Sequence, residues 1–227
     1  MKLPNEPVRG VSRLFAGCMT ALVLLAAPGC GGDDDSVPGA TTVAADQSLA
    51  ESLRLTRHDF PDGWEETPDQ PGESESPLDK CDPGDAPGRT GLAATGDFKQ
   101  GSDSVSNSVA VFQSPDAALA ALDRIPAQGA CMVVEIKGGA LNDETFEALD
   151  ATFEPFSFPA TGDRVDAHRF AMKLKQLSSG AELTVTLDLV YVVKGRVGYS
   201  LSAQGVLTPV DGNLLEALAA TMAGRLP

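Results

Sequence analysis

The clearest alternation of apolar and polar positions lies near the C-terminal end of the chain, in residues 181–193 (AELTVTLDLVYVV). Side chains of a β-strand point alternately to two faces, so a period of two predicts a half-buried strand. Lys194–Gly195 then predicts a two-residue hairpin turn into an antiparallel partner. The apolar face of the first strand consists of Leu183, Val185, Leu187, Leu189, Tyr191 and Val193. We expect the partner strand to continue that face with Val197, Tyr199, Leu201 and Ala203.

Four further segments are expected to contain extended chain. Ser104–Phe112 has apolar residues on both faces, which is typical of a central strand. Thr90–Phe98 is a weaker strand, and Phe146–Phe158 is extended with an interruption at Pro155. In residues 163–175, one face of a strand carries His168, Phe170, Met172 and Leu174.

Two helices are indicated by apolar residues at helical spacing and by signals at their ends. The first starts at Ser114, a favourable N-cap, has Pro115 in its first turn and stops before Pro126. The second is capped by Asp211, and its apolar stripe is Leu214, Leu215, Leu218, Ala219 and Met222. Residues 127–137 fit either a helix or a strand, and we favour a helix.

These elements predict an α+β fold, an antiparallel β-sheet with helices packed on it, because the strands follow one another in hairpins without a repeated strand–helix alternation. Pro61–Gly88 differs from the rest, since it is rich in proline and acidic residues and poor in large apolar ones. We interpret this stretch as an irregular surface loop.

The N-terminal end has the layout of an export signal. Lys2, Arg9 and Arg13 precede an uncharged run, Leu14–Pro28 (LFAGCMTALVLLAAP). The run has about 15 residues, fewer than the roughly 20 that a membrane-spanning helix needs. Basic residues before the run and acidic residues after it predict that the remainder of the chain lies outside the cytoplasm.

The run ends in Ala27, Pro28, Gly29 and Cys30, which resembles the lipobox of bacterial lipoproteins. That resemblance implies acylation of the Cys30 thiol and removal of residues 1–29 as a signal peptide. The lipobox prefers leucine three residues before the cysteine, and this chain has Ala27 there. An ordinary cleaved signal or an uncleaved N-terminal anchor is the alternative.

Residues 30–48 are small and acidic, so we interpret them as a flexible tether that precedes a single domain of residues 49–227. The formal net charge of the chain is −15 at pH 7. Such a charge repels nucleic acid and anionic lipid headgroups, which argues against a nucleic-acid partner. The expected membrane contact is through acyl chains on Cys30.

The chain has four cysteines, of which Cys18 belongs to the signal and Cys30 is assigned to the lipid. Cys81 and Cys131 remain, and in an oxidising compartment two cysteines are the number that one disulfide needs. Two free buried thiols are the alternative.

No motif of a hydrolase, metalloprotease or nucleotide-binding protein occurs, so we expect neither enzymatic activity nor a cofactor. His58 and His168 are weak candidates for a ligand site, and surface or edge positions are the alternative. Trp64 is expected to pack a turn against the sheet, or else to form the lip of a ligand cleft. The acidic cluster of Asp79, Asp82 and Asp85 lacks the spacing of a calcium loop, and no metal site is predicted.

Several segments together resemble secreted actinobacterial lipoproteins and the sensor-like extracellular domains of some receptor kinases. They are the opening LRLTRHDFPDGW (Leu53–Trp64), the strand SNSVAVF, the helix SPDAALAALDRI with a cysteine after it, TGDRVDAHRF, and VVKGRV before the last helix. More distantly, the chain is similar to the PsbP/Mog1 type of α/β/α sandwich. The resemblance implies a curved antiparallel sheet with a cleft and a role in ligand or partner binding. Kinase-linked members carry two disulfides, whereas this chain can form only one.

The sequence therefore favours a lipid-anchored, non-catalytic binding or sensor-like domain for a small amphiphilic ligand or an envelope protein. The weak candidate contacts are Trp64, His58 and His168. A lipid-anchored hydrolase with a catalytic triad built from scattered residues is one alternative. A structural envelope protein without a ligand is the other.

Overall fold

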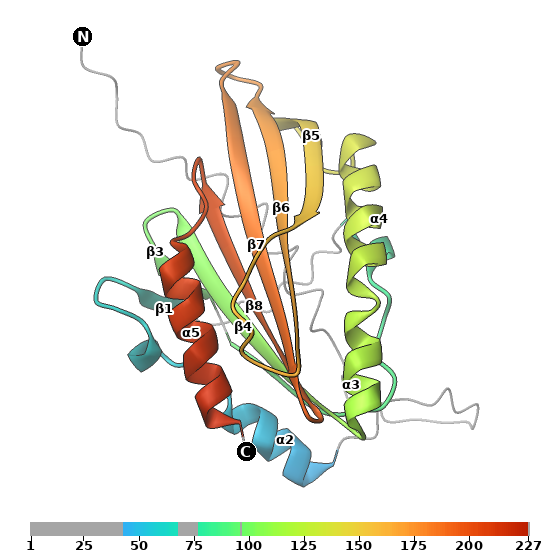
Figure 1. Cartoon of the computed structure of the whole chain (residues 1–227). Coiled ribbons are helices and arrows are strands. Elements are labelled where there is room, and N and C mark those ends of the chain that lie inside the picture. The colour runs from blue at the N-terminus through green and yellow to red at the C-terminus, as the bar shows by residue number, and fades with distance from the viewer. Residues whose placement is uncertain (1–42, 68–76, 96, 227) are drawn as a thin grey trace, which may run out of the picture.

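The computed structural model describes residues 43–67, 77–95 and 97–226. They form an eight-stranded antiparallel sheet, strongly twisted, with helices on both faces (Figure 1). The strand order is β1-β3-β4-β8-β7-β6-β5, and β2 pairs with β4 as well. The predicted fold class, an antiparallel sheet with helices packed on it, is confirmed.

Each element has the following bounds. The strands are β1 (Glu65–Thr67), β2 (Arg89–Ala94), β3 (Asp97–Gln100), β4 (Asp103–Phe112), β5 (Phe146–Pro155), β6 (Arg164–Gln176), β7 (Glu182–Lys194) and β8 (Val197–Val206). The helices are α2 (Ala44–Ser52), α3 (Pro115–Leu122), α4 (Ile125–Lys137) and α5 (Gly212–Arg225), with short 3₁₀ turns η1 (Arg57–Asp59) and η2 (Asp79–Cys81).

The β7–β8 hairpin turns one residue later than the sequence pattern predicts. Lys194 pairs with Val197, so the two turn residues are Gly195 and Arg196. Gly195 has a φ of +57°, a conformation that glycine adopts without strain. Directly opposite residues of a hairpin share one face, and Tyr191 lies opposite Ser200. The expected single apolar face is therefore wrong, because odd-numbered positions of β7 face the same side as even-numbered positions of β8.

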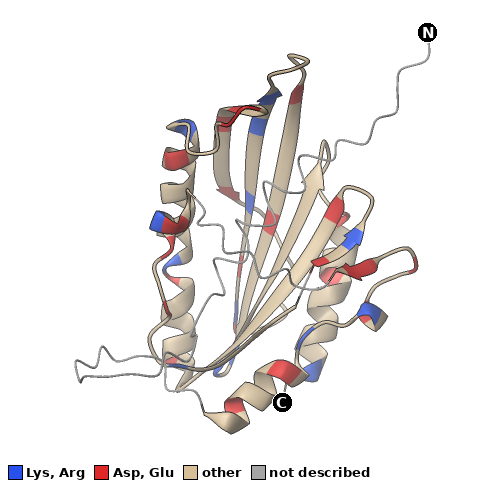
Figure 2. Cartoon of the chain, turned by 180° about the vertical axis from the view of Figure 1, so that it is seen from behind, with Lys and Arg blue, Asp and Glu red and all other residues tan. Residues whose placement is uncertain are grey.

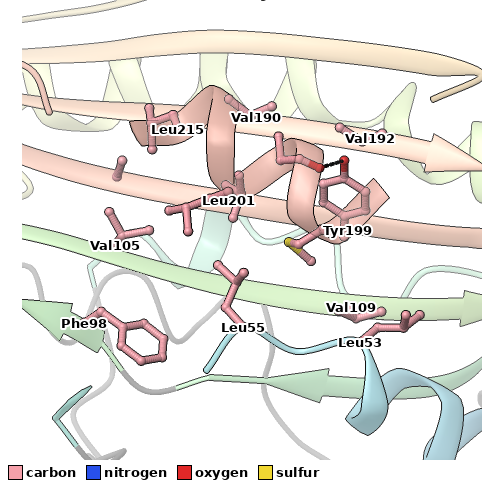
Figure 3. Close-up of a cluster of buried hydrophobic side chains, with 14 of the residues drawn as sticks. Leu53, Leu55, Phe98, Val105, Val109, Val190, Val192, Tyr199, Leu201 and Leu215 are labelled. Atoms are coloured by element: carbon pink, nitrogen blue, oxygen red, sulfur yellow. Dashed lines mark hydrogen bonds between the residues drawn. The ribbon is translucent and has the colours of Figure 1, made fainter. Parts of the chain in front are cut away.

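As a result, the sheet is buried from two sides. β7 is buried continuously from Val185 to Val193, so it is a central strand and not the predicted half-buried one. One core lies between the sheet and α2 and α5, and Figure 3 shows part of it. Its members include Leu55, Phe98, Val105, Val109, Tyr199, Leu201 and Leu215. A second core lies between the sheet and α3 and α4, and it includes Ile136, Phe170, Met172, Leu187 and Tyr191.

The predicted helix starts are confirmed. The Ser114 hydroxyl accepts a hydrogen bond from the Ala117 N–H at the start of α3, and the Asp211 carboxylate accepts one from the Asn213 N–H at the start of α5. Residues 127–137 are helical, as we favoured, within α4. Pro126 lies in the first turn of α4, where a missing N–H is tolerated. This proline therefore marks the start of α4 as well as the separation of α4 from α3.

Two of the predicted extended segments differ in detail from the structure. The single strand expected at residues 90–98 is two strands, β2 and β3, which pair with successive parts of the same edge of β4. β4 is central as predicted, because β8 pairs with its other edge. The segment expected to be extended with an interruption at Pro155 is β5, which ends at that proline.

Helix α2 starts inside the stretch that was expected to be a flexible tether. Asp46 on α2 is buried, and its carboxylate accepts hydrogen bonds from the Thr90 hydroxyl at 2.5 Å and from the Arg196 guanidinium at 2.6 and 2.7 Å. These bonds hold the pKa of Asp46 at about 2. These contacts join α2 to the sheet, so we propose that the domain begins with α2 and not at the expected residue 49. The signal peptide, Cys30 and the first part of the tether lie outside the described residues.

Candidate functional site: a cleft between α3, α4 and the sheet

A disulfide fixes one wall of the candidate site. Cys81 at the end of η2 is bonded to Cys131 in the middle of α4, which confirms the predicted pairing. Lys80 forms an ion pair with Glu135 of α4 at 2.5 Å. Arg124, just before α4, donates hydrogen bonds to the carbonyl oxygens of Pro83 and Asp85. Residues 80–85 are therefore held against the start and middle of α4.

A cleft of about 130 Å³ lies between this wall, the α3–α4 junction and the sheet. Its helical side is apolar, with contributions from Ala118, Leu122 and Ile125. Its floor consists of short side chains from β4 and β8, namely Ser108, Ala110, Gly198 and Ser200. Because these side chains are small, they leave the space between the sheet and the helices unfilled. Seen from behind, the strands at the centre of the sheet are almost free of charged residues (Figure 2).

Three hydroxyl-bearing residues lie side by side across the strands at this floor. Ser108 of β4 is directly opposite Ser200 of β8, and Ser200 is directly opposite Tyr191 of β7. The two serine hydroxyls are 2.9 Å apart and hydrogen-bond to each other. They therefore satisfy each other, whereas the tyrosine hydroxyl extends further from the sheet.

The Tyr191 hydroxyl is the unusual group of the site. Tyr191 is only 5% exposed and lines the cleft. Its hydroxyl has no hydrogen-bond partner within the described parts of the chain. Burial raises the pKa of this phenol well above its ordinary value, so the hydroxyl stays protonated and is a hydrogen-bond donor. Among the described residues only His168 Nδ1 is both fully enclosed and without a partner, so the Tyr191 oxygen itself opens into the cleft, where water or a bound molecule can reach it.

The other tyrosine shows the usual arrangement. Tyr199 lies on β8 and faces the opposite side of the sheet, in the core beneath α5. Its hydroxyl is 3.1 Å from the carbonyl oxygen of Ala219 on α5, to which it donates a hydrogen bond (Figure 3). The two tyrosines are neighbours in the sheet but differ in whether their hydroxyls are satisfied.

Charged groups at the rim of the cleft are balanced in sign. Arg89 forms an ion pair with Asp85 at 2.5 Å. Arg124 is occupied by two backbone carbonyl oxygens, and the Asp82 carboxylate accepts a hydrogen bond from the Gly84 N–H at 2.8 Å. The cleft lining thus contributes two cations, Arg89 and Arg124, and one anion, Asp82, and Asp85 beside the cleft neutralises Arg89.

The structure does not bring the predicted site residues together. Trp64 is 4% exposed, and its ring lies 5.3 Å from that of Phe60, in the core on the α5 side. This arrangement supports the packing role of Trp64, and it places the ring away from the cleft lining. His58 is exposed on η1. None of the three residues lines the cleft.

His168 has a distinct environment on β6. Its ring stacks on Phe153 of β5 with the ring centroids 4.6 Å apart. Its Nδ1 atom is buried and has no hydrogen-bond partner among the described residues. Burial lowers the pKa of His168, and the charge of Asp166 partly opposes that shift. Within the described residues, neither histidine hydrogen-bonds to a serine or a carboxylate, and no cluster of three or more His, Cys, Asp or Glu side chains is placed to hold a metal ion.

Sequence reasoning missed the residues that line the cleft. The sequence pattern assigns Tyr191 to the apolar face of its strand and Ser200 to the opposite face of the partner strand, and it gives Ser108 no role. The available signal was the serine at every second position of residues 104–108 and 200–202, combined with the correct hairpin register. That register places Ser200 opposite Tyr191 and Ser108 opposite Ser200.

Comparison with known proteins gives a distant structural likeness. No family model matches the chain, and no curated protein matches it. Among solved structures, the chain is similar to the extracellular domain of PknH from Mycobacterium tuberculosis. The two share 13% sequence identity with a TM-score of 0.43, over 82% of this chain and 97% of that chain. At this identity and score, the likeness carries no argument about function.

Proposed function

We propose that the chain is a membrane-anchored, extracytoplasmic lipoprotein whose folded domain is a non-catalytic, sensor-like module that binds a small ligand in the cleft. The observation that carries the proposal is the Tyr191 hydroxyl, which opens into the cleft and has no partner among the described residues. Small-molecule sites are typically apolar hollows with a few polar groups that orient the ligand. The apolar helical side and the hydroxyls of the floor fit that description.

Two features support the proposed location. The basic start, the short apolar run and Cys30 in residues 1–30 fit an exported and acylated chain. The disulfide between Cys81 and Cys131 fits an oxidising compartment outside the cytoplasm. Two or more acyl chains on Cys30 would hold the protein stably on the membrane.

Binding is favoured over hydrolysis as the role of the domain. A hydrolase of the serine type needs a nucleophile within hydrogen-bond reach of a base. In the described residues, the hydroxyls of Ser108 and Ser200 bond to each other, and His168 stacks on Phe153 without a hydrogen bond. No specific observation supports a catalytic role, so we propose none.

Native mass spectrometry tests the binding role directly. The chain carrying Cys30→Ser is purified without detergent or reductant, and its native and denatured masses are compared. We expect an adduct that is lost on denaturation. It should also be lost in Ala110→Leu, which fills part of the cleft, and retained in Ala217→Leu, which changes an exposed position of α5. A bare native mass, or an adduct that persists in Ala110→Leu, argues for a structural protein or for another site.

The anchor is tested separately by Cys30→Ala. We expect this variant to leave the membrane fraction or to accumulate as an unprocessed precursor, because acylation of the thiol precedes removal of the signal. Membrane retention and processing identical to those of the parent chain would reject the lipoprotein assignment while leaving the binding role untouched.

A further inference from the structure

Two side chains that line the cleft carry hydrogen-bond donors without a partner among the described residues, the Tyr191 hydroxyl and the Gln128 amide. The Tyr191 hydroxyl stays protonated because burial raises its pKa, so at neutral pH it can donate a hydrogen bond to a ligand. The serine pair beside it already has an internal hydrogen bond. A bound molecule that offers an acceptor atom to Tyr191 would replace water as the partner of this hydroxyl.

The charges around the cleft select against an ionic ligand. Asp85 neutralises Arg89, and the remaining rim charges, Asp82 and Arg124, are one anion and one cation. Both of these groups already have backbone partners, the Gly84 N–H for Asp82 and the carbonyl oxygens of Pro83 and Asp85 for Arg124. An ionic group on the ligand would lose its hydration, and the charged groups that it meets at the rim are already ion-paired or hydrogen-bonded to the backbone.

The size of the cleft limits the ligand. Its volume of about 130 Å³ is close to that of an engineered apolar cavity of about 150 Å³ that binds benzene. Phe112, Leu122 and Ile125 supply apolar surface around this space. The buried part of a ligand is therefore about the size of one six-membered ring or a short branched alkyl group.

From these three features we infer that the cleft binds a neutral, mainly apolar small molecule, or the neutral end of a longer one, through a single acceptor oxygen such as a carbonyl that hydrogen-bonds to Tyr191. This inference rests on the proposed function, because it assigns the ligand class of the same site. It adds three requirements on the ligand: no net charge, an acceptor atom for Tyr191, and a buried group of limited size.

A panel of four probes of similar size tests the requirements for neutrality and for an acceptor atom separately. Acetophenone carries a neutral carbonyl, ethylbenzene lacks an acceptor, benzoate is an anion and benzylamine is a cation. Binding of each to the full chain carrying Cys30→Ser is measured by isothermal titration calorimetry. We expect acetophenone to bind roughly 3- to 10-fold more tightly than ethylbenzene, the range of one neutral hydrogen bond, and the two ions to bind more weakly than either.

The two tyrosines provide a matched pair of variants. Tyr191→Phe removes an unpaired hydroxyl, so it should fold as well as the parent and lose the preference for acetophenone over ethylbenzene. Tyr199→Phe removes a hydroxyl that bonds to the backbone of α5, so it should lower the melting temperature and keep the preference. An unchanged preference in Tyr191→Phe, or tightest binding of benzoate or benzylamine, overturns the inference.

The outcomes also separate this inference from the proposed function. If native mass spectrometry finds a cleft adduct but none of the four probes binds, the ligand class is wrong and the binding role stands. If there is neither an adduct nor probe binding, both are wrong. Probe binding that is unaffected by Ala110→Leu places the probes outside the cleft and overturns the inference as well.

Discussion

At the scale of single residues, the same side chain has different roles on the two faces of the sheet. Tyr191 and Tyr199 lie on adjacent strands, and the sequence pattern assigns both to apolar strand faces. Only the register of the hairpin, with Tyr191 opposite Ser200 and Tyr199 opposite Val192, separates them. The candidate site therefore could not be predicted from the apolar pattern alone, because a two-residue turn places odd-numbered positions of β7 on the same face as even-numbered positions of β8, and the exact position of the turn sets which serine lies opposite Tyr191.

His168 predicts a pH dependence of stability. Its pKa is lowered from the ordinary 6.5 by burial, so the unfolded chain takes up a proton at a higher pH than the folded chain does. Well above the ordinary pKa of 6.5, this group should therefore leave the free energy of unfolding unchanged. As the pH falls from about 6.5 toward the lowered pKa, the free energy of unfolding should decrease. Replacement by phenylalanine keeps the stack on Phe153 and removes the titration.

Urea unfolding at about pH 7 and about pH 5 measures this effect. The stability of the parent should decrease more over this interval than that of His168→Phe. His58→Gln, which changes the exposed histidine of η1, is the control and should follow the parent. Identical pH dependence in the parent and His168→Phe would show that the buried ring does not resist protonation.

At the scale of elements, local sequence signals predicted most helices and strands. The features that these signals did not predict depend on pairing and packing with distant parts of the chain. Ser114 and Asp211 identify the helix starts because capping depends only on nearby residues. The division of residues 90–98 into β2 and β3 depends on pairing with β4, which a local pattern does not contain. The same holds for the burial of β7 on both faces, since it requires helices from distant parts of the chain.

Gly129 explains how closely α4 approaches β5. A Cβ atom at this buried position would lie 2.3 Å from the Phe153 ring. That ring cannot move easily, because it stacks on His168 and lies against Phe170. Gly129→Ala should therefore lower the free energy of unfolding by about 1–3 kcal/mol, although alanine is the better helix former. Chemical denaturation measures the change.

Gly224 in α5 is the matched control for this substitution. No atom lies within 4 Å of the position that its Cβ would occupy, and the residue is exposed. Gly224→Ala should leave stability unchanged or raise it by up to about 1 kcal/mol, as expected for an open helical position. Equal effects of the two substitutions would mean that the contact between α4 and β5 is not tight.

The disulfide joins a loop segment to a helix and should stabilise both the fold and the cleft wall. Its two cysteines are 50 residues apart in sequence, and closing such a loop stabilises a fold by roughly 4 kcal/mol in the chain-entropy model. The double variant Cys81→Ala/Cys131→Ala should lose about 2–4 kcal/mol of unfolding free energy. Under conditions where the fold persists, hydrogen exchange at the Gly84 N–H should accelerate more than exchange in α5.

A control distinguishes the covalent link from the contacts around it. Lys80→Ala removes the ion pair with Glu135, in which the lysine side chain is 58% exposed. An exposed pair of this kind contributes less than about 1 kcal/mol, so this variant should unfold almost as the parent does. If the double cysteine variant is no less stable than Lys80→Ala, the bond does not contribute to the fold as we argue.

At the scale of the whole molecule, composition and charge predict a single acidic domain that begins at residue 49, whereas we propose that it begins with α2. Residues 43–48 look like tether because they are small and polar and contain no large apolar side chain other than Val43. Their place in the fold depends on polar contacts with distant residues. The Gln47 side chain bonds to both the N–H and the carbonyl oxygen of Leu92, and Gly91 has no side chain where α2 crosses it.

Two fragments of different length test whether α2 belongs to the domain. A fragment that starts at Val43 keeps the contacts of Asp46 and Gln47, whereas one that starts at Leu49 lacks both residues and leaves too short a segment to form a stable helix. The longer fragment should show the higher denaturation midpoint at neutral pH.

The pKa of Asp46 is held at about 2 instead of 3.8. The contribution of the ionised Asp46 to the free energy of unfolding is therefore complete above pH 3.8 and is lost as the pH falls toward 2. The difference between the two fragments should therefore shrink in that acidic range, and Asp46→Asn in the longer fragment should remove this pH-dependent part. Equal midpoints at neutral pH would indicate that residues 43–48 belong to the tether and not to the folded domain.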